Sequence, residues 1–289
     1  MQRRIDVALL AAVPKEIEGL ADWLSLSTGG SVGGESFALG THNGWTALLG
    51  TLGFGKVNAA ATVAALAERF DLAQVWHLGC AGAYAGGPLQ IGDVLITTQF
   101  VCGDEGILTT VGEVSQTGIG IPIVVTDGQG YHDTLPAHEK LLAWARTVTP
   151  AGRYQLDLRP SHRALMQDYP VAPTAGFEPY AGNISAPRES FQVIYGPSVT
   201  VSLVSGDEAV AIERWQRYRT LAENMEGSAV AQACLRFGIP VLECRGMSNP
   251  AGDRRKDHWR IEQAIAHCHA VVYRWLAGLP SAQDEGHTS

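Results

Sequence analysis

The feature of this sequence that most constrains its fold is the alternation of continuous apolar runs with segments of helical character. Runs of this kind are typical of β-strands covered by helices on both faces. They fall at residues 5–12, 45–53, 72–86, 91–102, 198–206 and 239–249. The helical segments are residues 54–70, 131–148, 221–237 and 258–277. This alternation predicts an α/β fold built on a largely parallel sheet.

Charge and composition exclude several classes of function. A net charge of -8 and a pI near 5.6 do not favour binding to nucleic acid or anionic membranes. With 46% hydrophobic and 17% charged residues, the chain has the composition of a globular protein. No apolar stretch reaches the roughly 18 residues that a membrane helix needs, and we expect a cytoplasmic protein.

The sequence also lacks the motifs of zinc sites and of common nucleotide-binding loops. The five cysteines are scattered, and none has the spacing of a zinc ligand, so we interpret them as reduced thiols. The segment "GFGK" at 53–56 lacks most of a P-loop, and "GCAGAYAGG" at 79–87 lacks the acidic ribose partner of a Rossmann fingerprint. We expect neither a metal nor an organic cofactor.

The organisation of the chain indicates one domain over residues 1–279, because no linker interrupts the pattern. The Gly- and Ser-rich stretch 25–36 is typical of a loop. Prolines, glycines and polar residues are dense between 112 and 197, which predicts an irregular insertion that contains one helix. The tail 280–289 is expected to fray.

Polar residues follow several of the expected strands, at the positions where α/β folds bind ligands. These segments are Pro14–Glu16, Gly53–Lys56, Gly79–Gly82, Ser205–Asp207 and Ser248-Asn249. Two Gly-rich turns after two apparently neighbouring strands favour a backbone cradle for a ligand.

Each candidate residue also has a structural interpretation. Glu16 stands where a carboxylate stabilises the first turn of a helix. Asn249 follows a strand as many turn residues do, and Cys80 has the size of a small core residue. The charged run 253–260 is typical of a solvated helix start. Glu226 is different, because apolar residues surround it and buried carboxylates need partners.

Taken together and in order, these segments resemble the purine nucleoside phosphorylase/nucleosidase superfamily. The resemblance covers most of the chain except the middle. Its carriers are "ALLAAVPKEIEGL", "GTLGFGKVNAA", "HLGCAGAY", "LQIGDVLITT", "VSGDEA", "ENMEGSAVAQAC" and "GIPVLECRGMSNPAGD". Within the superfamily, "GDEG" at 103–106, "AENMEG" at 222–227 and "RGMSNPAGDRRKDHW" at 245–259 look most like the futalosine hydrolases.

The resemblance implies an α/β/α sandwich of three layers around a mixed, barrel-like sheet, usually assembled as a homo-oligomer. It also implies roles for three charged residues. Glu226 would accept hydrogen bonds from the 2′- and 3′-hydroxyls of a ribose, which suits an ionised carboxylate. Glu16 would position and activate the attacking water, and Arg245 would help to orient Glu16.

Other residues would surround the nucleoside, by the same resemblance. Cys80, Ala81 and Gly82 would line the sugar, Met225 would lie beneath the ribose, and Phe54 would pack near the 5′ substituent. The remaining substrate-binding candidates are Asn224, Val210 and Ser248.

Two departures from relatives in the superfamily indicate the reaction. Relatives that release adenine carry Asp where this chain has Asn249, whose amide suits the O6 and N7 of a 6-oxopurine such as hypoxanthine. Phosphorylases carry Arg near the positions of Glu16 and His77, and a carboxylate is unfavourable beside a phosphate dianion. Hydrolysis is therefore favoured over phosphorolysis.

The resemblance implies hydrolysis of futalosine to hypoxanthine and dehypoxanthinyl futalosine, on a route to menaquinone. The benzoate of futalosine needs a cationic pocket, for which Arg254 and Arg255 are candidates, with Arg163 and Arg188 as others. The alternatives are another nucleosidase, a 6-oxopurine nucleoside phosphorylase, or a nucleoside-binding protein without catalysis.

Overall fold

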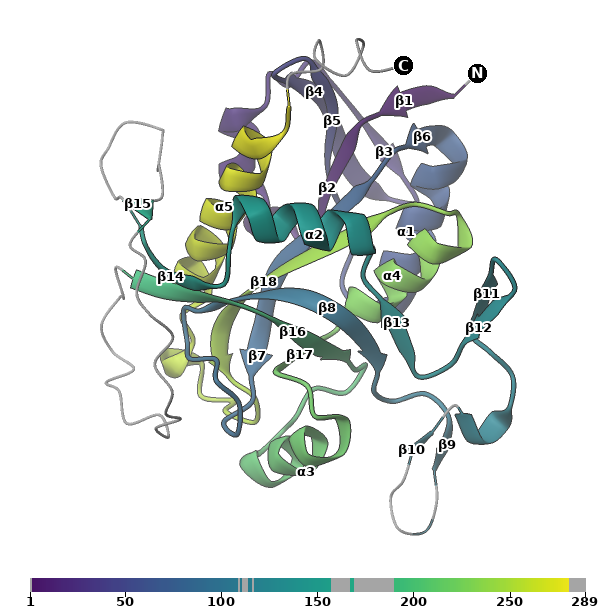
Figure 1. Cartoon of the computed structure of the whole chain (residues 1–289), viewed down its shortest axis with the longest axis vertical. Coiled ribbons are helices and arrows are strands. Elements are labelled where there is room, and N and C mark those ends of the chain that lie inside the picture. Colours follow the sequence, from purple (N-terminus) through teal and green to yellow (C-terminus); the bar gives the residue numbers. More distant parts are fainter. Residues whose placement is uncertain are drawn as a thin grey trace.

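A closed barrel of five strands forms the centre of the molecule in the computed structural model (Figure 1). The structure describes residues 2–108, 110, 114–115, 117–156, 167–168 and 190–280. Around the barrel, β7 pairs with β18, β18 with β8, β8 with β16, β16 with β17, and β17 with β7. The barrel strands are β7 (Val75–Ala83), β8 (Val94–Cys102), β16 (Ser190–Thr200), β17 (Ala222–Asn224) and β18 (Val241–Pro250). Because parallel and antiparallel pairs both occur, the sheet is mixed.

The sheet continues beyond β7 as an open extension. Its strands, in order from β7, are β2 (Val7–Ala11), β5 (Trp45–Thr51), β4 (Glu35–His42) and β3 (Thr28–Val32). The prediction of a loop over 25–36 was wrong, because β3 and the start of β4 form a hairpin there. This edge strand is largely exposed, so it lacks the apolar pattern by which the other strands were recognised.

Helices cover both faces of the sheet, and the side chains of β2 show the three layers directly. Val7, Leu9 and Ala11 pack into a core with α5 (Ile261–Gly278) and α2 (Glu139–Val148). Ala8 and Leu10 point to the other face, into a core with α1 (Lys56–Arg69) and α4 (Gly227–Arg236). The alternation follows from the two-residue period of a strand. The predicted three-layer fold around a mixed barrel is confirmed.

Three segments differ locally from the sequence prediction. The segment 131–148 is helical only from Glu139, because Thr134–Pro136 forms a strand, β13. The segment 221–237 is not one helix, because its first part is the strand β17 and α4 begins only at Gly227. A helix that was not predicted, α3 (Glu208–Tyr218), follows the polar segment 205–207. Its start is capped by Asp207, whose side chain accepts a hydrogen bond from Val210 N at 3.0 Å.

The described parts of the expected insertion contain regular structure. They include β11 (Val124–Thr126), β12 (Gln129–Tyr131), β13 (Thr134–Pro136), α2, β14 (Gly152–Gln155) and the start of β16. Since β13 pairs with β8 and β14 with β16, part of this range extends the central sheet. Arg163 and Arg188 lie outside the described residues, as does the tail from residue 281.

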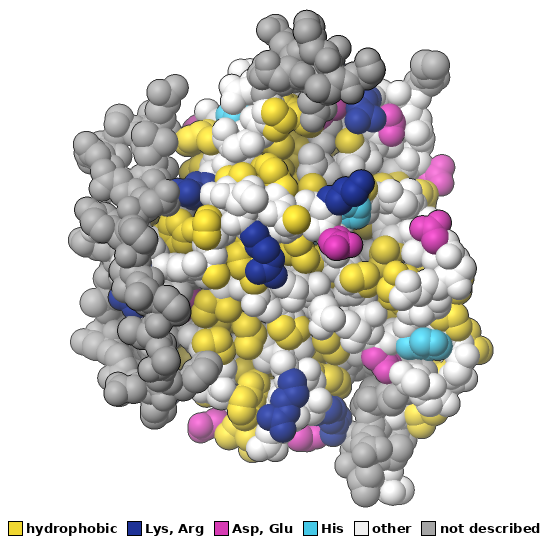
Figure 2. Space-filling model, viewed as in Figure 1, with side chains coloured by type: hydrophobic (Ala, Val, Ile, Leu, Met, Phe, Trp, Pro, Cys, Tyr) yellow, Lys and Arg dark blue, Asp and Glu magenta, His cyan; other side chains and the backbone are white. Residues whose placement is uncertain are grey.

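Short elements complete the description. They are β1 (Arg3–Ile5), β6 (Phe70–Leu72), β9 (Ile107–Leu108), β10 (Val114–Ser115), β15 (Gln167–Asp168) and the 3-10 turns η1 (Pro14–Glu16), η2 (Glu18–Trp23), η3 (Thr117–Ile119) and η4 (Lys256–His258). Figure 2 shows scattered Lys and Arg side chains on the visible face, without a continuous basic patch. None of the helices in the described ranges is long and apolar enough to cross a membrane.

Candidate active site

Glu16 lies at the end of η1, where its carboxylate turns inward onto the barrel. The residue is only 8% exposed. Its Oε1 accepts a hydrogen bond from Cys80 N at 2.8 Å, which ties the first strand-end segment to the second Gly-rich turn. Burial raises the pKa of Glu16, and the nearby Arg245 only partly opposes that effect. Glu16 is therefore a more basic carboxylate than a surface glutamate.

Glu226 faces a backbone amide and a buried guanidinium, which answers the question that its apolar surroundings raise. It occupies the N-cap position of α4 and is 5% exposed. Its Oε1 accepts a hydrogen bond from Gly55 N at 3.0 Å, and its Oε2 lies 3.8 Å from Arg245 Nη2. Gly55 adopts a φ of 87°, which favours glycine, and this turn presents its amide to the carboxylate.

Arg245 lies near both carboxylates, Glu16 and Glu226, on the buried side of the site. It is fully buried on β18, and its Nη1 donates to Cys80 O at 3.4 Å. A side chain at Gly79 would place its Cβ 2.7 Å from both Arg245 Nη1 and Glu16 Oε1. Both groups thus pack against the bare backbone of Gly79. The predicted grouping of Glu16, Arg245 and Glu226 at one end of the barrel is present.

The residues behind Arg245 were not predicted to belong to the site, although His77 was compared with an arginine of the phosphorylases. Glu243 and His77 are both fully buried, and Glu243 Oε2 lies 3.0 Å from Arg245 Nη2 and 2.9 Å from His77 Nδ1. A signal was present in the strand "VLECRGM", because residues two apart in a strand lie on the same face. A Glu two residues before an Arg in an apolar strand therefore indicates a buried ion pair.

The segment proposed to hold the base forms its own hydrogen bonds in this structure. Ser248 Oγ donates to Asn249 Oδ1 at 2.8 Å, and Asn249 Nδ2 donates to Pro250 O at 2.9 Å. Asn249 lies opposite Gly82 in the pairing of β18 with β7, after an irregularity in the register. The bonds fix the amide orientation, so a base would have to share or replace them.

Asn224 occupies the same end of the barrel but serves mainly as a cap. Its Oδ1 accepts hydrogen bonds from Gly227 N at 2.7 Å and Glu226 N at 3.1 Å. Among the described residues its Nδ2 has no hydrogen-bond partner. Of the other candidates, Ala81 is buried, Phe54 is 62% exposed, and four are half-buried: Cys80, Gly82, Val210 and Met225.

The arginines predicted for an anionic substituent already have neighbours. Arg255 is exposed and pairs with Asp253 at 2.8 Å. The guanidinium of Arg254 lies 4.8 Å from the centre of the Trp259 ring. Neither of them lines the cavity described next, although Trp259 does.

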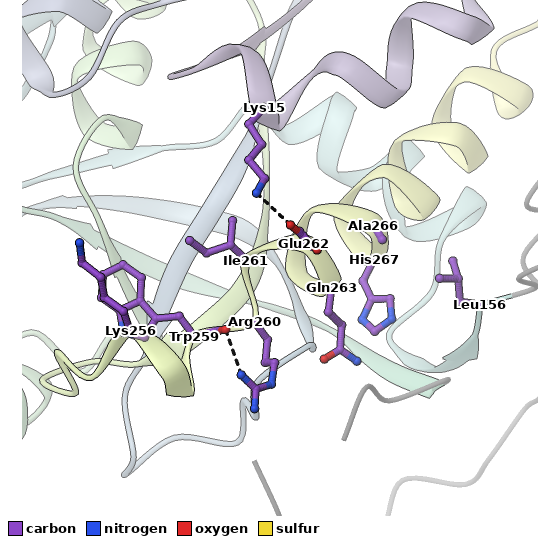
Figure 3. Close-up of a pocket in the computed structure, with 10 residues that line it drawn as sticks. All are labelled: Lys15, Leu156, Lys256, Trp259, Arg260, Ile261, Glu262, Gln263, Ala266 and His267. Atoms are coloured by element: carbon purple, nitrogen blue, oxygen red, sulfur yellow. Dashed lines mark hydrogen bonds and ion pairs between the residues drawn. The ribbon is translucent and has the colours of Figure 1, made fainter. Parts of the chain in front are cut away.

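A cavity of about 750 Å³ opens beside the catalytic segments (Figure 3). It brings together three cationic side chains and an indole, and Figure 3 shows Lys15 at one end and Lys256 with Trp259 at another. Its lining is Lys15, Leu156, Lys256, Trp259, Arg260, Ile261, Glu262, Gln263, Ala266 and His267. Glu262 bonds Lys15 at 3.1 Å, whereas neither Lys256 nor Arg260 pairs with a carboxylate of the described chain.

Backbone contacts place this cavity next to the site. Lys15 directly precedes Glu16, Arg260 N donates to Ser248 O at 2.8 Å, and Cys80 Sγ lies 3.9 Å from Ile261 O. Its inner wall is thus formed by residues bonded to the strand ends that carry the sugar and base candidates. The described residues contain no cluster of His, Cys, Asp or Glu that could hold a metal ion.

A closed mixed barrel with two buried carboxylates and an arginine at one end suits an N-glycosidase, and the comparisons with futalosine hydrolases and nucleosidases support that class. The chain belongs to the Phosphorylase superfamily, whose family model matches residues 6–277. A futalosine hydrolase of Thermus thermophilus is 30% identical over 252 residues, covering 84% of this chain and 88% of that protein. The resemblance seen in the sequence is confirmed.

Relatives with another name are almost as similar. A 5′-methylthioadenosine/S-adenosylhomocysteine nucleosidase of Bacillus pumilus is 26% identical and covers 93% of this chain and 97% of that protein. In structure, a nucleosidase of that name from Colwellia psychrerythraea gives a TM-score of 0.70 at 21% identity, over 96% of this chain and 97% of that one. A futalosine hydrolase mutant of Helicobacter pylori gives 0.69 at 18%, over 95% and 100%.

Proposed function

We propose that this protein hydrolyses the N-glycosidic bond of futalosine and releases hypoxanthine and dehypoxanthinyl futalosine, in a cytoplasmic route to menaquinone. The observation that carries the hydrolysis is the position of Glu16, held by Cys80 N and packed with Arg245 against Gly79. The similarity to the Thermus thermophilus futalosine hydrolase supports the choice of substrate.

In the proposed reaction, water attacks C1′ as the bond between C1′ and the base nitrogen breaks. The bonding electron pair leaves with the base, and the sugar acquires cationic character. Glu226 binds the two ribose hydroxyls, and its negative charge stabilises that cation. Glu16 takes the proton of the water, which its raised pKa favours. The departing base takes up a proton from solvent, Glu16 returns its proton to solvent, and the attacking water supplies the new C1′ hydroxyl.

Water suits this site better than phosphate because of its charge. Arg245 is the cation next to Glu16, but Glu243 and Glu226 both lie within 4 Å of its Nη2. A phosphate dianion would therefore meet a guanidinium that is already balanced and a carboxylate that repels it. This argument favours hydrolysis over the phosphorylase alternative.

The cavity of Figure 3 supports a substrate with an aromatic carboxylate on its 5′ side. Lys256 and Arg260 supply positive charge that no carboxylate of the described residues balances, and Trp259 and Ile261 supply apolar surface, so the cavity suits a benzoate. These two cations replace Arg254 and Arg255 as our candidates. A methylthio substituent would leave such charges unused, which favours futalosine over methylthioadenosine.

The double variant Lys256→Met, Arg260→Met tests this assignment. We expect KM for futalosine to rise about tenfold, because the two charge-assisted contacts with the carboxylate would together contribute about 1.4 kcal/mol. The KM for inosine, which lacks the carboxylate, should stay the same. Arg255→Met and the exposed Lys140→Met serve as matched controls. An equal loss for both substrates would contradict the assignment.

The direct test of the function is release of free base from futalosine, inosine and methylthioadenosine, each with and without phosphate. Hypoxanthine from futalosine, independent of phosphate, is the expected result. Preference for inosine together with formation of ribose 1-phosphate would establish the phosphorylase alternative. Binding of these nucleosides without base release would indicate a binding protein.

We also propose a homo-oligomer, in which a second copy covers an apolar patch beside the site. Phe54, Val57 and Leu203 are 62%, 83% and 76% exposed. They lie near one another, because Lys56 pairs with Asp104, which in turn accepts a hydrogen bond from Ser202 N. A solution mass of twice the chain's 30.8 kDa or more is expected by light scattering. A monomer at all concentrations would contradict this proposal.

A further inference from the structure

A third buried carboxylate, Glu243, lies behind Glu16, Glu226 and Arg245, and no step of the proposed reaction uses it. Glu243 is completely buried inside the barrel. Its Oε1 accepts from Thr97 Oγ1 at 2.7 Å and from Ser198 Oγ at 3.2 Å. Its Oε2 accepts from Arg245 Nη2 at 3.0 Å and lies 2.9 Å from His77 Nδ1. These partners come from β7, β8, β16 and β18, four of the five barrel strands.

The charges in this network can be assigned. Burial opposes the ionisation of Glu243, but Arg245 and His77 outweigh that effect and lower its pKa to about 2. Burial and the neighbouring Arg245 lower the pKa of His77, so the imidazole is neutral and donates one hydrogen bond. The centre of the network is therefore a single buried ion pair between Glu243 and Arg245. Such a pair is costly to desolvate, and among the described residues the buried Arg245 Nε has no hydrogen-bond partner.

The position of Arg245 makes this ion pair important for catalysis. One end of its guanidinium packs beside Glu16 at Gly79, and the other lies 3.8 Å from Glu226. A buried guanidinium without a counter-charge would close on one of those carboxylates. It would then occupy an oxygen that the water or the ribose diol needs, and it would weaken Glu16 as a base.

We propose that Glu243 is a positioning residue, which holds Arg245 back from the two reacting carboxylates and balances its charge. The inference rests on the proposed hydrolysis. It identifies Glu243 as the residue that keeps Glu16 able to act as the general base. Removal of the Glu243 charge would leave Glu16 and Glu226 as the described carboxylates nearest to the guanidinium, whose remaining contacts, with His77 and Cys80 O, are to neutral groups. The groups that face Glu16 from the surrounding elements are Arg245, Glu226 and Cys80, with Glu243 and His77 beyond Arg245, and His269, which bonds its backbone oxygen.

Glu243→Gln is the test, because glutamine preserves the shape and removes the charge. Its amide oxygen can accept from Arg245 and His77, and its NH₂ can donate to the hydroxyls of Thr97 and Ser198. We expect kcat to fall at least about tenfold with little change in KM. The acid limb of the pH profile should move to lower pH by about one unit, because Glu16 then feels an unbalanced cation.

Glu223→Gln is the matched control for loss of a buried ion pair. Glu223 is 5% exposed, lies 3.3 Å from Arg214 and accepts from Ser205 and Tyr84, but has no bond to Arg245. This variant should lose stability without moving the acid limb. If Glu243→Gln behaves in the same way, Glu243 is only structural and the proposal is overturned.

Two further measurements test the inference if no nucleoside is cleaved or if Glu243→Gln does not fold. Carbon-13 NMR of labelled glutamate, with Glu16 assigned from Glu16→Gln, follows its titration without substrate. A lower midpoint in Glu243→Gln supports the inference even if no nucleoside is cleaved, in which case only the proposed function fails. If the Gln variant does not fold, Glu243→Asp keeps the charge but shortens the reach, and kcat should fall several-fold with the acid limb in place. Unchanged kcat in that variant would overturn the proposal.

Discussion

Glu16→Gln is expected to abolish most base release, with kcat reduced about a hundred- to ten-thousand-fold. The amide oxygen can still accept the hydrogen bond from Cys80 N, so the local fold should persist. The variant has no general base at this position, because an amide cannot take a proton from water at neutral pH. The substrate should still bind, so KM should change little, and steady-state kinetics with a chromatographic assay for free base would measure both.

The pH dependence of the reaction rate provides a second test of Glu16. In the wild type, activity requires the deprotonated carboxylate, so the rate should fall as the pH drops through the raised pKa of Glu16. That acid limb should be absent from the residual activity of Glu16→Gln. The matched control is Glu18→Gln, an exposed acid two residues further on. Wild-type turnover by Glu16→Gln would remove Glu16 from the mechanism.

Glu226→Ala is expected to produce the second large effect, a loss of kcat/KM of about a hundred- to thousand-fold. The substitution removes the acceptor for the ribose hydroxyls and a negative charge near the sugar cation. It also leaves Gly55 N without its acceptor, so some loss of stability is expected. Thermal unfolding separates that loss from the kinetic effect.

A 2′-deoxy substrate shows whether the loss concerns the ribose. The wild type should discriminate strongly against the 2′-deoxy form of the nucleoside that it accepts. Glu226→Ala should discriminate much less, because the acceptor for that hydroxyl is gone. Equal discrimination in both proteins would show that Glu226 does not bind the sugar, whatever its effect on rate.

The general architecture followed from local patterns, but closure of the barrel did not. Apolar runs and helical segments predicted an α/β fold because each shows its hydrophobic pattern within a short stretch of sequence. The strand β17 has only three residues, and it pairs with β16 and β7, which are distant in sequence. Its identity depends on those partners, so the segment was interpreted as the start of a helix.

The candidate site was predicted where polar residues stand at element ends or where the resemblance to the superfamily assigned a role, as for Arg245, and it was missed at Glu243 in the same strand. Glu16 and Glu226 stand at element ends, where polar residues attract attention. Glu243 lies inside an apolar strand, and its role depends on His77 and Thr97 from two other strands. The cavity with Lys256 and Arg260 likewise depends on how the start of α5 packs, which no local pattern records. The catalytic and binding roles themselves stay predictions until the variants are measured.

The strand β17 has a consequence for the timing of assembly. It closes the barrel and leads within two residues to Glu226, the N-cap residue of α4, whose carboxylate accepts a hydrogen bond from Gly55 N in another part of the chain. Glu226, the predicted acceptor for the ribose hydroxyls, is therefore in place only when β17 has paired with β16 and β7. We therefore expect the predicted binding site to form together with the barrel, and we expect a bound nucleoside to slow the local opening that exposes β17 to hydrogen exchange.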